Sequence, residues 1–245
     1  MKELSKSIAR RQRDPNFITR YFIGSGIDIG GAPDPLFLYL ELFPLITDLK
    51  VWDLSDGDAQ FMKTQPDESL DFVVSSHCLE HLNDPVEGIK NWFRIIKPGG
   101  YLIVTVPEED LYEQGTWPST KNLDHKFTFT INKLTSWSPK SINILDLLIA
   151  LGEKADIRKI SVEDSGFRFN MPEYDQTLTP ISESAIEFIV RKKKTQEIIG
   201  NKSKSISGNQ PDAELRRYFN QYKADLKFMK DGNKDKSIFA DESNL

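Results

Sequence analysis

The clearest indication of the fold lies in residues 70–107, LDFVVSSHCLEHLNDPVEGIKNWFRIIKPGGYLIVTVP. This stretch opens with a short apolar run over 70–75 that is typical of a buried strand. Apolar side chains then recur at helical spacing over 83–96, with Asn83 or Asp84 as the N-cap. The sequence KPGG ends this helix, and a second strand is predicted over 101–106. Two strands joined by a helix indicate a parallel sheet, because parallel strands need a crossover connection.

The same alternation of strands and helices continues on both sides of this stretch. Further strands are predicted over 26–29, 49–54, 157–162 and 185–190, and a further helix over 144–151. After the first strand, Asp34 is the expected N-cap of a helix that has Pro35 at its first position. We therefore predict the α/β class, with a Rossmann-like, doubly wound and mostly parallel sheet whose last strand is antiparallel.

Composition divides the chain into four parts. Residues 1–23 predict a polar helical segment, and residues 24–194 contain all the predicted strands. Residues 195–210 include NKSKSISGNQ, a polar, Ser-rich sequence that cannot bury a core and indicates a linker. Residues 211–245 carry aromatic side chains at helical spacing and then a polar end, which predicts a C-terminal helix and tail.

The overall composition excludes several classes of protein. The 32 basic and 37 acidic side chains give a net charge of −5 without a basic footprint, so nucleic acid is not an expected partner. Cys78 is the one cysteine, which excludes an intrachain disulfide and fits a reducing compartment. No apolar run approaches the length of a bilayer-crossing helix, and the charged N-terminus lacks the apolar centre of a signal peptide. We expect a cytoplasmic protein without membrane insertion.

Small and polar residues follow the predicted strands at the sheet edge where α/β proteins bind ligands. Gly30 and Gly31 permit a tight turn and a close approach of the backbone to a ligand. Asp53 lies 23 residues beyond Gly30, near the separation at which an acidic side chain binds ribose hydroxyls. This spacing predicts a nucleoside ligand. The other candidates for cofactor contact at this edge are Asp58, Ala59 and Ser76.

The glycines do not form the dinucleotide-binding pattern G-x-G-x-x-G, because Gly24, Gly26 and Gly30 have the wrong spacing. Asp34 at the start of the predicted helix would also repel a pyrophosphate rather than bind it. These two features favour a nucleoside without phosphates over NAD or FAD.

Four motifs in order carry a resemblance to a known family. They are 26-GIDIGG, 51-VWDLSDGDA, 67-DESLDFVVSSHCLEHLNDP and 97-KPGGYLIVTVP. Together they resemble the class I methyltransferases that use S-adenosyl-L-methionine, in the group of ubiquinone-biosynthesis and glycan methyltransferases. The resemblance is close over residues 24–107 and continues loosely to about residue 194. It implies S-adenosyl-L-methionine as the cofactor.

The resemblance also implies roles for single residues. Asp28 and Gly30 would belong to the loop around the methionine end of the cofactor. Asp53 would bind the ribose, and Asp58 with Ala59 would flank the adenine.

The chain departs from the family pattern in two places. Ala32 and Asp34 replace the later glycines of the first loop. Asp53 and Asp58 are only five residues apart, so the usual helix and strand between them are missing. Asp53 therefore ends either the second strand or the third.

The motif H-x-x-E-H, made by His77, Glu80 and His81, has the spacing of an inverted zinc-peptidase motif. The predicted strand ends where this motif begins, so the motif is expected to form a strand-to-helix corner on which the two imidazoles need not share a face. Short motifs often match by chance. We therefore predict no metal site, with His81 as a packed corner residue and His77 at the rim of the crevice.

A hydroxyl acceptor of a methyl group must lose a proton, and histidine, with a pKa of about 6.5, suits that task. The candidate catalytic residues are His77 and His125, the latter in the polar loop 122-NLDHKFTF-129. The expected activity is methyl transfer to a small-molecule acceptor, by resemblance a hydroxyl of a sugar or glycan precursor in carbohydrate biosynthesis. The alternatives are a non-catalytic module that retains the fold and an NAD-dependent oxidoreductase. The oligomeric state stays open.

Overall fold

A computed structural model describes residues 2–131, 133–171 and 174–199, together with Lys223 and Lys227. Residues 1–201 form one compact unit and residues 202–245 a second one. Lys223 and Lys227 are helical, and the rest of the predicted C-terminal helix and tail lies outside the described residues. Among the described helices, none has the length and apolar character needed to cross a bilayer.

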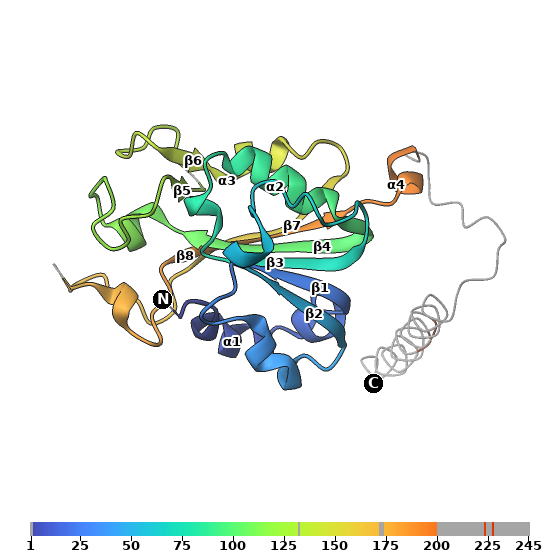
Figure 1. The fold of residues 1–245 in the computed structure, drawn as a ribbon. Coiled ribbons are helices and arrows are strands. Elements are labelled where there is room, and N and C mark those ends of the chain that lie inside the picture. The colour runs from blue at the N-terminus through green and yellow to red at the C-terminus, as the bar shows by residue number, and fades with distance from the viewer. Residues whose placement is uncertain (1, 132, 172–173, 200–222, 224–226, 228–245) are drawn as a thin grey trace, which may run out of the picture. The chain divides into compact units, whose positions relative to one another are not determined.

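Six strands of the first unit form one sheet in the order β2-β1-β3-β4-β8-β7 (Figure 1). Their bounds are β1 Gly24–Ile29, β2 Ile46–Trp52, β3 Leu70–Ser76, β4 Ile96–Pro107, β7 Ala155–Glu163 and β8 Ala185–Lys192. The first four strands in this order pair in parallel, and β8 is antiparallel to both of its neighbours. The predicted α/β class and the mostly parallel, Rossmann-like sheet with an antiparallel last strand are confirmed.

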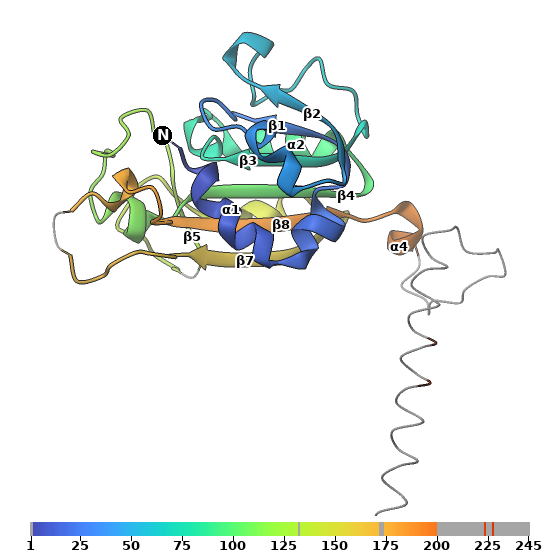
Figure 2. The ribbon, with the colours of Figure 1, turned by 90° about the horizontal axis from the view of Figure 1, so that it is seen from below.

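Helices cover both faces of this sheet (Figures 1 and 2). One face carries α1 Leu4–Arg13 and the short helices Phe17–Tyr21 and Leu36–Leu42, and the other carries α2 Pro85–Arg94 and α3 Ile144–Ile149. Side chains of β3 alternate between the faces, so Phe72 and Val74 join the core under α1 while Val73 joins the core under α2. Burial on both faces explains why β3 is a continuous apolar run.

Arg11 ties α1 to the middle of the sheet. Its Nη2 lies 2.9 Å from Glu187 Oε2 on β8 and donates to Thr105 Oγ1 on β4 at 3.0 Å. The side chains of Arg11 and Glu187 are fully buried. Removing one member of such a pair leaves an uncompensated buried charge. The N-terminal segment, predicted as a polar helical segment over 1–23, contains α1 and packs through it as one layer of the first unit.

The predicted cap of the helix after β1 is wrong. Residues Leu36–Leu42 form a 3-10 helix whose first N–H, of Leu36, donates to Asp28 Oδ2 at 2.7 Å. The Asp34 carboxylate instead accepts from the Ser5 N–H and from the Tyr39 hydroxyl, both at 2.7 Å. The carboxylate of Asp34 is drawn away from the helix because α1 offers it a backbone donor.

Several boundaries also differ from the sequence-based prediction. Strand β4 begins at Ile96 and includes KPGG. Gly100 in this strand has no room for a side chain, since a Cβ there would clash with the Asp71 carbonyl oxygen on β3. A second, two-stranded parallel sheet, β5 Thr128–Thr130 with β6 Ser141–Asn143, was not predicted. The first five residues of the predicted linker form α4 Thr195–Ile199, in which Glu197 accepts from Arg191 of β8.

The connection between β2 and β3 is short, as the sequence predicted. It contains the 3-10 helix Leu54–Asp56 and neither a strand nor a longer helix. Asp53 directly follows β2 and caps this 3-10 helix by accepting from the Leu54 N–H at 2.7 Å. Asp53 therefore ends the second strand, which settles the alternative that the sequence left open.

Candidate active site

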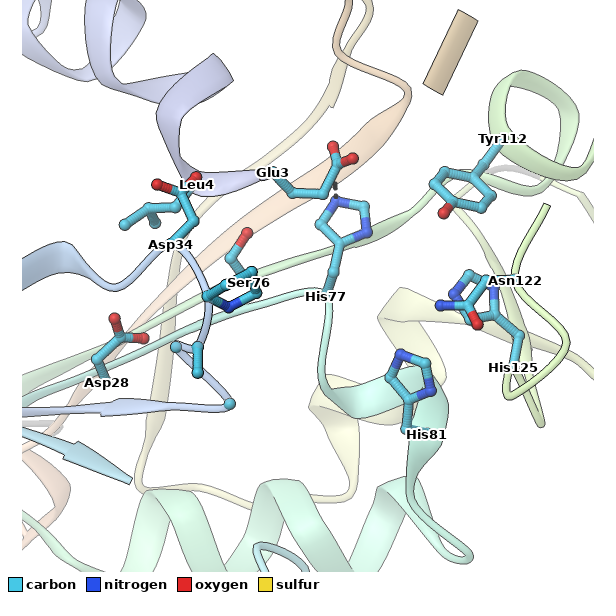
Figure 3. A pocket seen from close by; sticks show the side chains of 14 residues that line it. Glu3, Leu4, Asp28, Asp34, Ser76, His77, His81, Tyr112, Asn122 and His125 are labelled. Atoms are coloured by element: carbon cyan, nitrogen blue, oxygen red, sulfur yellow. Dashed lines mark ion pairs between the residues drawn. The ribbon is translucent and has the colours of Figure 1, made fainter. Parts of the chain in front are cut away.

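A cavity of about 160 Å³ opens at the carboxyl ends of β1 and β3 (Figure 3). The two strands are paired in parallel with Ile29 opposite Ser75, which brings the turn after β1 beside the turn after β3. The predicted site residues that line the cavity are Asp28, Gly30, Gly31, Ser76, His77 and His125. Figure 3 shows Asp28 and Asp34 on one side of it and His81, His125 and Tyr112 on the other.

Asp28 is a buried carboxylate with an unused oxygen. Its Oδ2 accepts from the Leu36 N–H, whereas its Oδ1 has no hydrogen-bond partner in the part of the chain that the structure describes. Burial raises the pKa of Asp28 to about 7, and the negative charges of Asp34 and Asp53 act in the same direction. A buried acceptor without a partner is costly, so this position favours a ligand that brings a donor or a positive charge.

The turn after β1 has room only for glycine. Gly30 has a φ of +72° and donates its N–H to the Trp52 carbonyl at 2.8 Å. A Cβ at Gly30 would lie 2.7 Å from Cys78 Cβ, and a Cβ at Gly31 would lie 2.6 Å from Asp28 Oδ2. The two glycines thus let the backbone pass against Asp28 and leave its surface open to the cavity.

The other predicted cofactor residues lie outside this cavity. Asp53 follows β2, the strand beside β1, while Asp58 lines a separate cavity of about 280 Å³ together with Trp52 and Gly57. The Asp58 carboxylate accepts from the Gln60 N–H at 2.8 Å, and the Ala59 carbonyl accepts from Trp92 Nε1 at 2.8 Å.

His77 stands at the corner after β3, with a φ of +54°. Its Nδ1 lies 3.5 Å from Glu80 Oε1, and its Nε2 lies 3.8 Å from Glu3 Oε2, the ion pair drawn dashed in Figure 3. Burial alone would lower the pKa of His77, but the carboxylates of Glu80 and Glu3 outweigh it and raise the pKa. The predicted strand-to-helix corner is confirmed, since the 3-10 helix Leu79–His81 follows directly.

His125 is held by a second carboxylate. Its Nδ1 lies 2.7 Å from Glu113 Oε1, and both side chains are almost fully buried. Its Nε2 points the other way, 3.8 Å from Glu80 Oε1. The rings of Tyr112 and His81 pack on it with centroids 5.1 and 5.0 Å away. The structure therefore brings all three histidines of the chain to one side of the cavity.

Sequence reasoning missed three contributors to this site. Glu3 and Leu4 line the cavity from α1, and Glu113 orients His125 from the short helix Glu109–Glu113. No local pattern marks them, because α1 lies far along the chain from the turns that it covers. Glu113 lies 12 residues before His125 in a stretch without regular spacing.

Comparison with known proteins assigns the family. A family model described as a methyltransferase domain matches residues 4–143. The chain therefore belongs to the family of methyltransferase-domain proteins.

Individual relatives match shorter parts of the chain than the family model does. A protein of Mycolicibacterium smegmatis named "Probable S-adenosylmethionine-dependent methyltransferase" is 36% identical over 50 residues, which are 20% of this chain and 20% of that protein. A tRNA U34 carboxymethyltransferase of Hydrogenovibrio crunogenus is 32% identical over 87 residues, which are 34% of this chain and 26% of that protein. The chain thus spans about a quarter or less of the length of these relatives.

A solved structure shares the fold. The crystal structure of a SAM-dependent methyltransferase from Archaeoglobus fulgidus superposes with a TM-score of 0.51 at 17% identity, covering 78% of this chain and 95% of that one. At this identity the likeness concerns the arrangement of strands and helices.

Proposed function

We propose that this chain transfers a methyl group from S-adenosyl-L-methionine to a hydroxyl group of a small-molecule acceptor. The observation that carries the proposal is the buried Asp28 carboxylate, which lines the cavity beside the glycine turn and whose Oδ1 is unpartnered among the described residues. Membership of the methyltransferase-domain family supports the reaction class.

The charge of the cavity suits this cofactor. S-adenosyl-L-methionine carries a positive charge on sulfur and an ammonium group at its methionine end. Three carboxylates, those of Glu3, Asp28 and Asp34, line the cavity and would attract such a ligand. The same carboxylates would repel the pyrophosphate of NAD, which argues against the oxidoreductase alternative. Asp28, Gly30 and Gly31 are the residues that we assign to the methionine end.

The nucleoside end is assigned to residues after β2. Asp53 stands where a ribose-binding carboxylate follows the strand next to β1, and Asp58 lines the neighbouring cavity of about 280 Å³. We assign the ribose to Asp53 and the adenine to Asp58 and Ala59, as the family resemblance implies. Ser76, at the end of β3, lies at the edge of the first cavity.

The histidine side of the cavity supplies the acceptor chemistry. The bound cofactor provides a methyl carbon that its cationic sulfur makes electrophilic, so the chain has to align the hydroxyl and remove its proton. His125 is the better base, because Nδ1 faces the Glu113 carboxylate and Nε2 is left with its lone pair. The pKa of His77 is raised by the carboxylates of Glu80 and Glu3, so this ring is a poorer base than an ordinary imidazole. We assign it to positioning the acceptor.

The acceptor class follows from charge and family. The net charge of −5 disfavours a polyanion, although one relative is named for action on tRNA. A neutral hydroxyl compound such as a sugar or glycan precursor is the acceptor that we propose, on the resemblance to glycan methyltransferases.

A turnover assay with two classes of acceptor tests this proposal. Purified protein would receive S-adenosyl-L-methionine with a panel of sugars, sugar nucleotides and phenols, or with bulk tRNA, while S-adenosylhomocysteine and methylated product are followed by mass spectrometry. We expect turnover with a small hydroxyl compound that is lost in His125→Gln and retained in Lys90→Ala, a change at an exposed position of α2. Turnover with tRNA alone, or equal turnover by His125→Gln, would overturn the proposal.

A further inference from the structure

We propose that Glu80, His81 and His125 form a binding site for a divalent first-row transition-metal ion such as Zn²⁺ or Fe²⁺. The three side chains each offer one ligand atom, and these atoms all lie within 4.8 Å of one another. The site goes beyond the proposed methyl transfer, and its test does not depend on that activity. It also differs from the H-x-x-E-H reading of the sequence, because His125 takes the place of His77.

The two imidazoles present the same nitrogen to Glu80. His81 Nε2 lies 3.9 Å and His125 Nε2 3.8 Å from Glu80 Oε1. Metal–ligand distances of about 2.1 Å at tetrahedral angles place ligand atoms about 3.4 Å apart. The two distances from Glu80 to the histidines would thus close by about half an ångström around an ion, and the two imidazole nitrogens start within 4.8 Å of each other.

Hydrogen bonds at the other ring nitrogen fix the tautomer of both histidines. His81 Nδ1 lies 3.1 Å from the Asp124 carbonyl oxygen, which can only accept a hydrogen bond. His125 Nδ1 lies 2.7 Å from the Glu113 carboxylate, which also accepts. Both rings therefore carry their proton on Nδ1 in the neutral form and turn the Nε2 lone pair toward Glu80. Metal-binding histidines are oriented in this way by a carboxylate or a carbonyl group.

The Glu80 carboxylate lacks a hydrogen-bond partner in the described part of the chain. Its side chain is fully buried, and neither carboxylate oxygen has a hydrogen-bond partner among the described residues. The nearest imidazole nitrogen, Nδ1 of His77, lies 3.5 Å away without hydrogen-bond geometry. The Glu80 carboxylate faces the Nε2 lone pair of His125 at 3.8 Å and that of His81 at 3.9 Å. These groups repel one another unless a cation lies between them.

The donor set indicates the class of ion. Two imidazoles and one carboxylate bind Zn²⁺ in hydrolases and Fe²⁺ in oxygenases, whereas Mg²⁺ and Ca²⁺ prefer oxygen ligands. Both histidines line the cavity, whereas Glu80 is not one of its lining residues. The remaining coordination positions therefore face the side of the cavity that we assign to the acceptor hydroxyl (Figure 3). Because a metal ion and a proton compete for the same lone pair, His125 Nε2 acts as the base only in the chain without a bound ion, and a bound ion would inhibit the proposed methyl transfer.

Cobalt titration of the full-length protein tests the site. After chelator treatment and dialysis, Co²⁺ would be added while visible d–d absorption is recorded, and Zn²⁺ would be titrated by calorimetry. We expect one ion per chain, with affinity reduced by at least about 100-fold in Glu80→Gln, His81→Gln and His125→Gln. Glu113→Gln should reduce it about 10- to 100-fold through loss of ring orientation.

His77→Gln is the matched control, because it removes an imidazole from the same cavity but not from the proposed site. It should bind Co²⁺ as tightly as the unchanged protein, because His77 contributes no ligand atom to the proposed site. Circular dichroism would establish that each variant folds, and His81, which is partly exposed, provides a ligand change that does not disturb the core.

Absence of stoichiometric Co²⁺ binding would overturn the proposal. So would loss of binding in His77→Gln with retention in His125→Gln, because the ion would then follow the H-x-x-E-H motif. S-adenosylhomocysteine affinity, measured on the same samples, reports on the proposed function separately.

Discussion

Replacing Asp28 with asparagine should stabilise the protein above neutral pH and abolish cofactor binding. The pKa of Asp28 rises from 3.8 to about 7 in the folded chain. Between these values the folded state holds a proton that the unfolded state releases, so the free energy of unfolding falls as the pH rises through this window and is level above it. At about 1.36 kcal/mol per pKa unit, the loss amounts to about 4 kcal/mol.

Asparagine at this position keeps a carbonyl oxygen to accept from the Leu36 N–H but does not titrate. Relative to the unchanged protein, Asp28→Asn should therefore gain about 4 kcal/mol between pH 4 and pH 8. Urea denaturation followed by circular dichroism at intervals of half a pH unit measures this difference. If the difference in the free energy of unfolding between the two proteins stayed constant across the whole pH range, the pKa of Asp28 would not be raised in the folded state.

Asp34→Asn is the matched control in the same cavity. Both Asp34 oxygens accept a hydrogen bond, from Ser5 and Tyr39, and an amide group can replace only one of these acceptors. The substitution should cost about 1 to 3 kcal/mol at neutral pH, the opposite sign to that of Asp28→Asn. If both variants were more stable than the unchanged protein at pH 8, the gain would come from the removal of any negative charge in the cavity and not from the burial of Asp28.

Three further predictions concern the turn, the ribose position and the buried ion pair. Gly30→Ala should lower stability by about 1 to 3 kcal/mol in thermal denaturation, because a Cβ there would lie 2.7 Å from Cys78 Cβ; an unchanged melting temperature would contradict the close packing of Gly30 against Cys78. Asp53→Ala should weaken S-adenosylhomocysteine binding by about 1 to 3 kcal/mol in calorimetry, and unchanged affinity would move the ribose contact elsewhere. The pKa of Glu187 falls to about 2, so its stabilisation is present above pH 4.5 and is lost as the pH falls toward 2. Glu187→Gln should therefore cost about 3 kcal/mol at pH 7 and nothing near pH 2 in urea denaturation, whereas a constant difference would exclude the ion pair as the cause.

The order of strands and helices was predictable because its signals are local. The apolar run of β3 and the Asp84 cap of α2, which accepts from the Val86 and Glu87 N–H groups, can be read within a few residues of sequence. The turn at Gly30 was also predictable from the sequence, since a positive φ at a strand end favours glycine.

The contacts that complete the site were not predictable, because they join distant parts of the chain. Asp28 rather than Asp34 caps the helix Leu36–Leu42, since α1 offers Asp34 the Ser5 N–H from 29 residues away. His125 approaches Glu80 through tertiary contacts, among them the Lys126 N–H that donates to the Glu80 carbonyl at 2.9 Å, and no spacing in the sequence encodes them. The periodicity of apolar residues in the sequence thus locates the edge of the sheet that carries the site. The contacts that the side chains make at that edge depend on tertiary packing.

Calorimetric titration with S-adenosylhomocysteine, with NAD as a parallel ligand, tests whether the Asp28 cavity binds S-adenosyl-L-methionine. We expect saturable binding of one S-adenosylhomocysteine per chain, loss of that binding in Asp28→Asn, and no binding of NAD. Binding of NAD alone, or of neither ligand, would contradict the assignment of the Asp28 cavity to S-adenosyl-L-methionine.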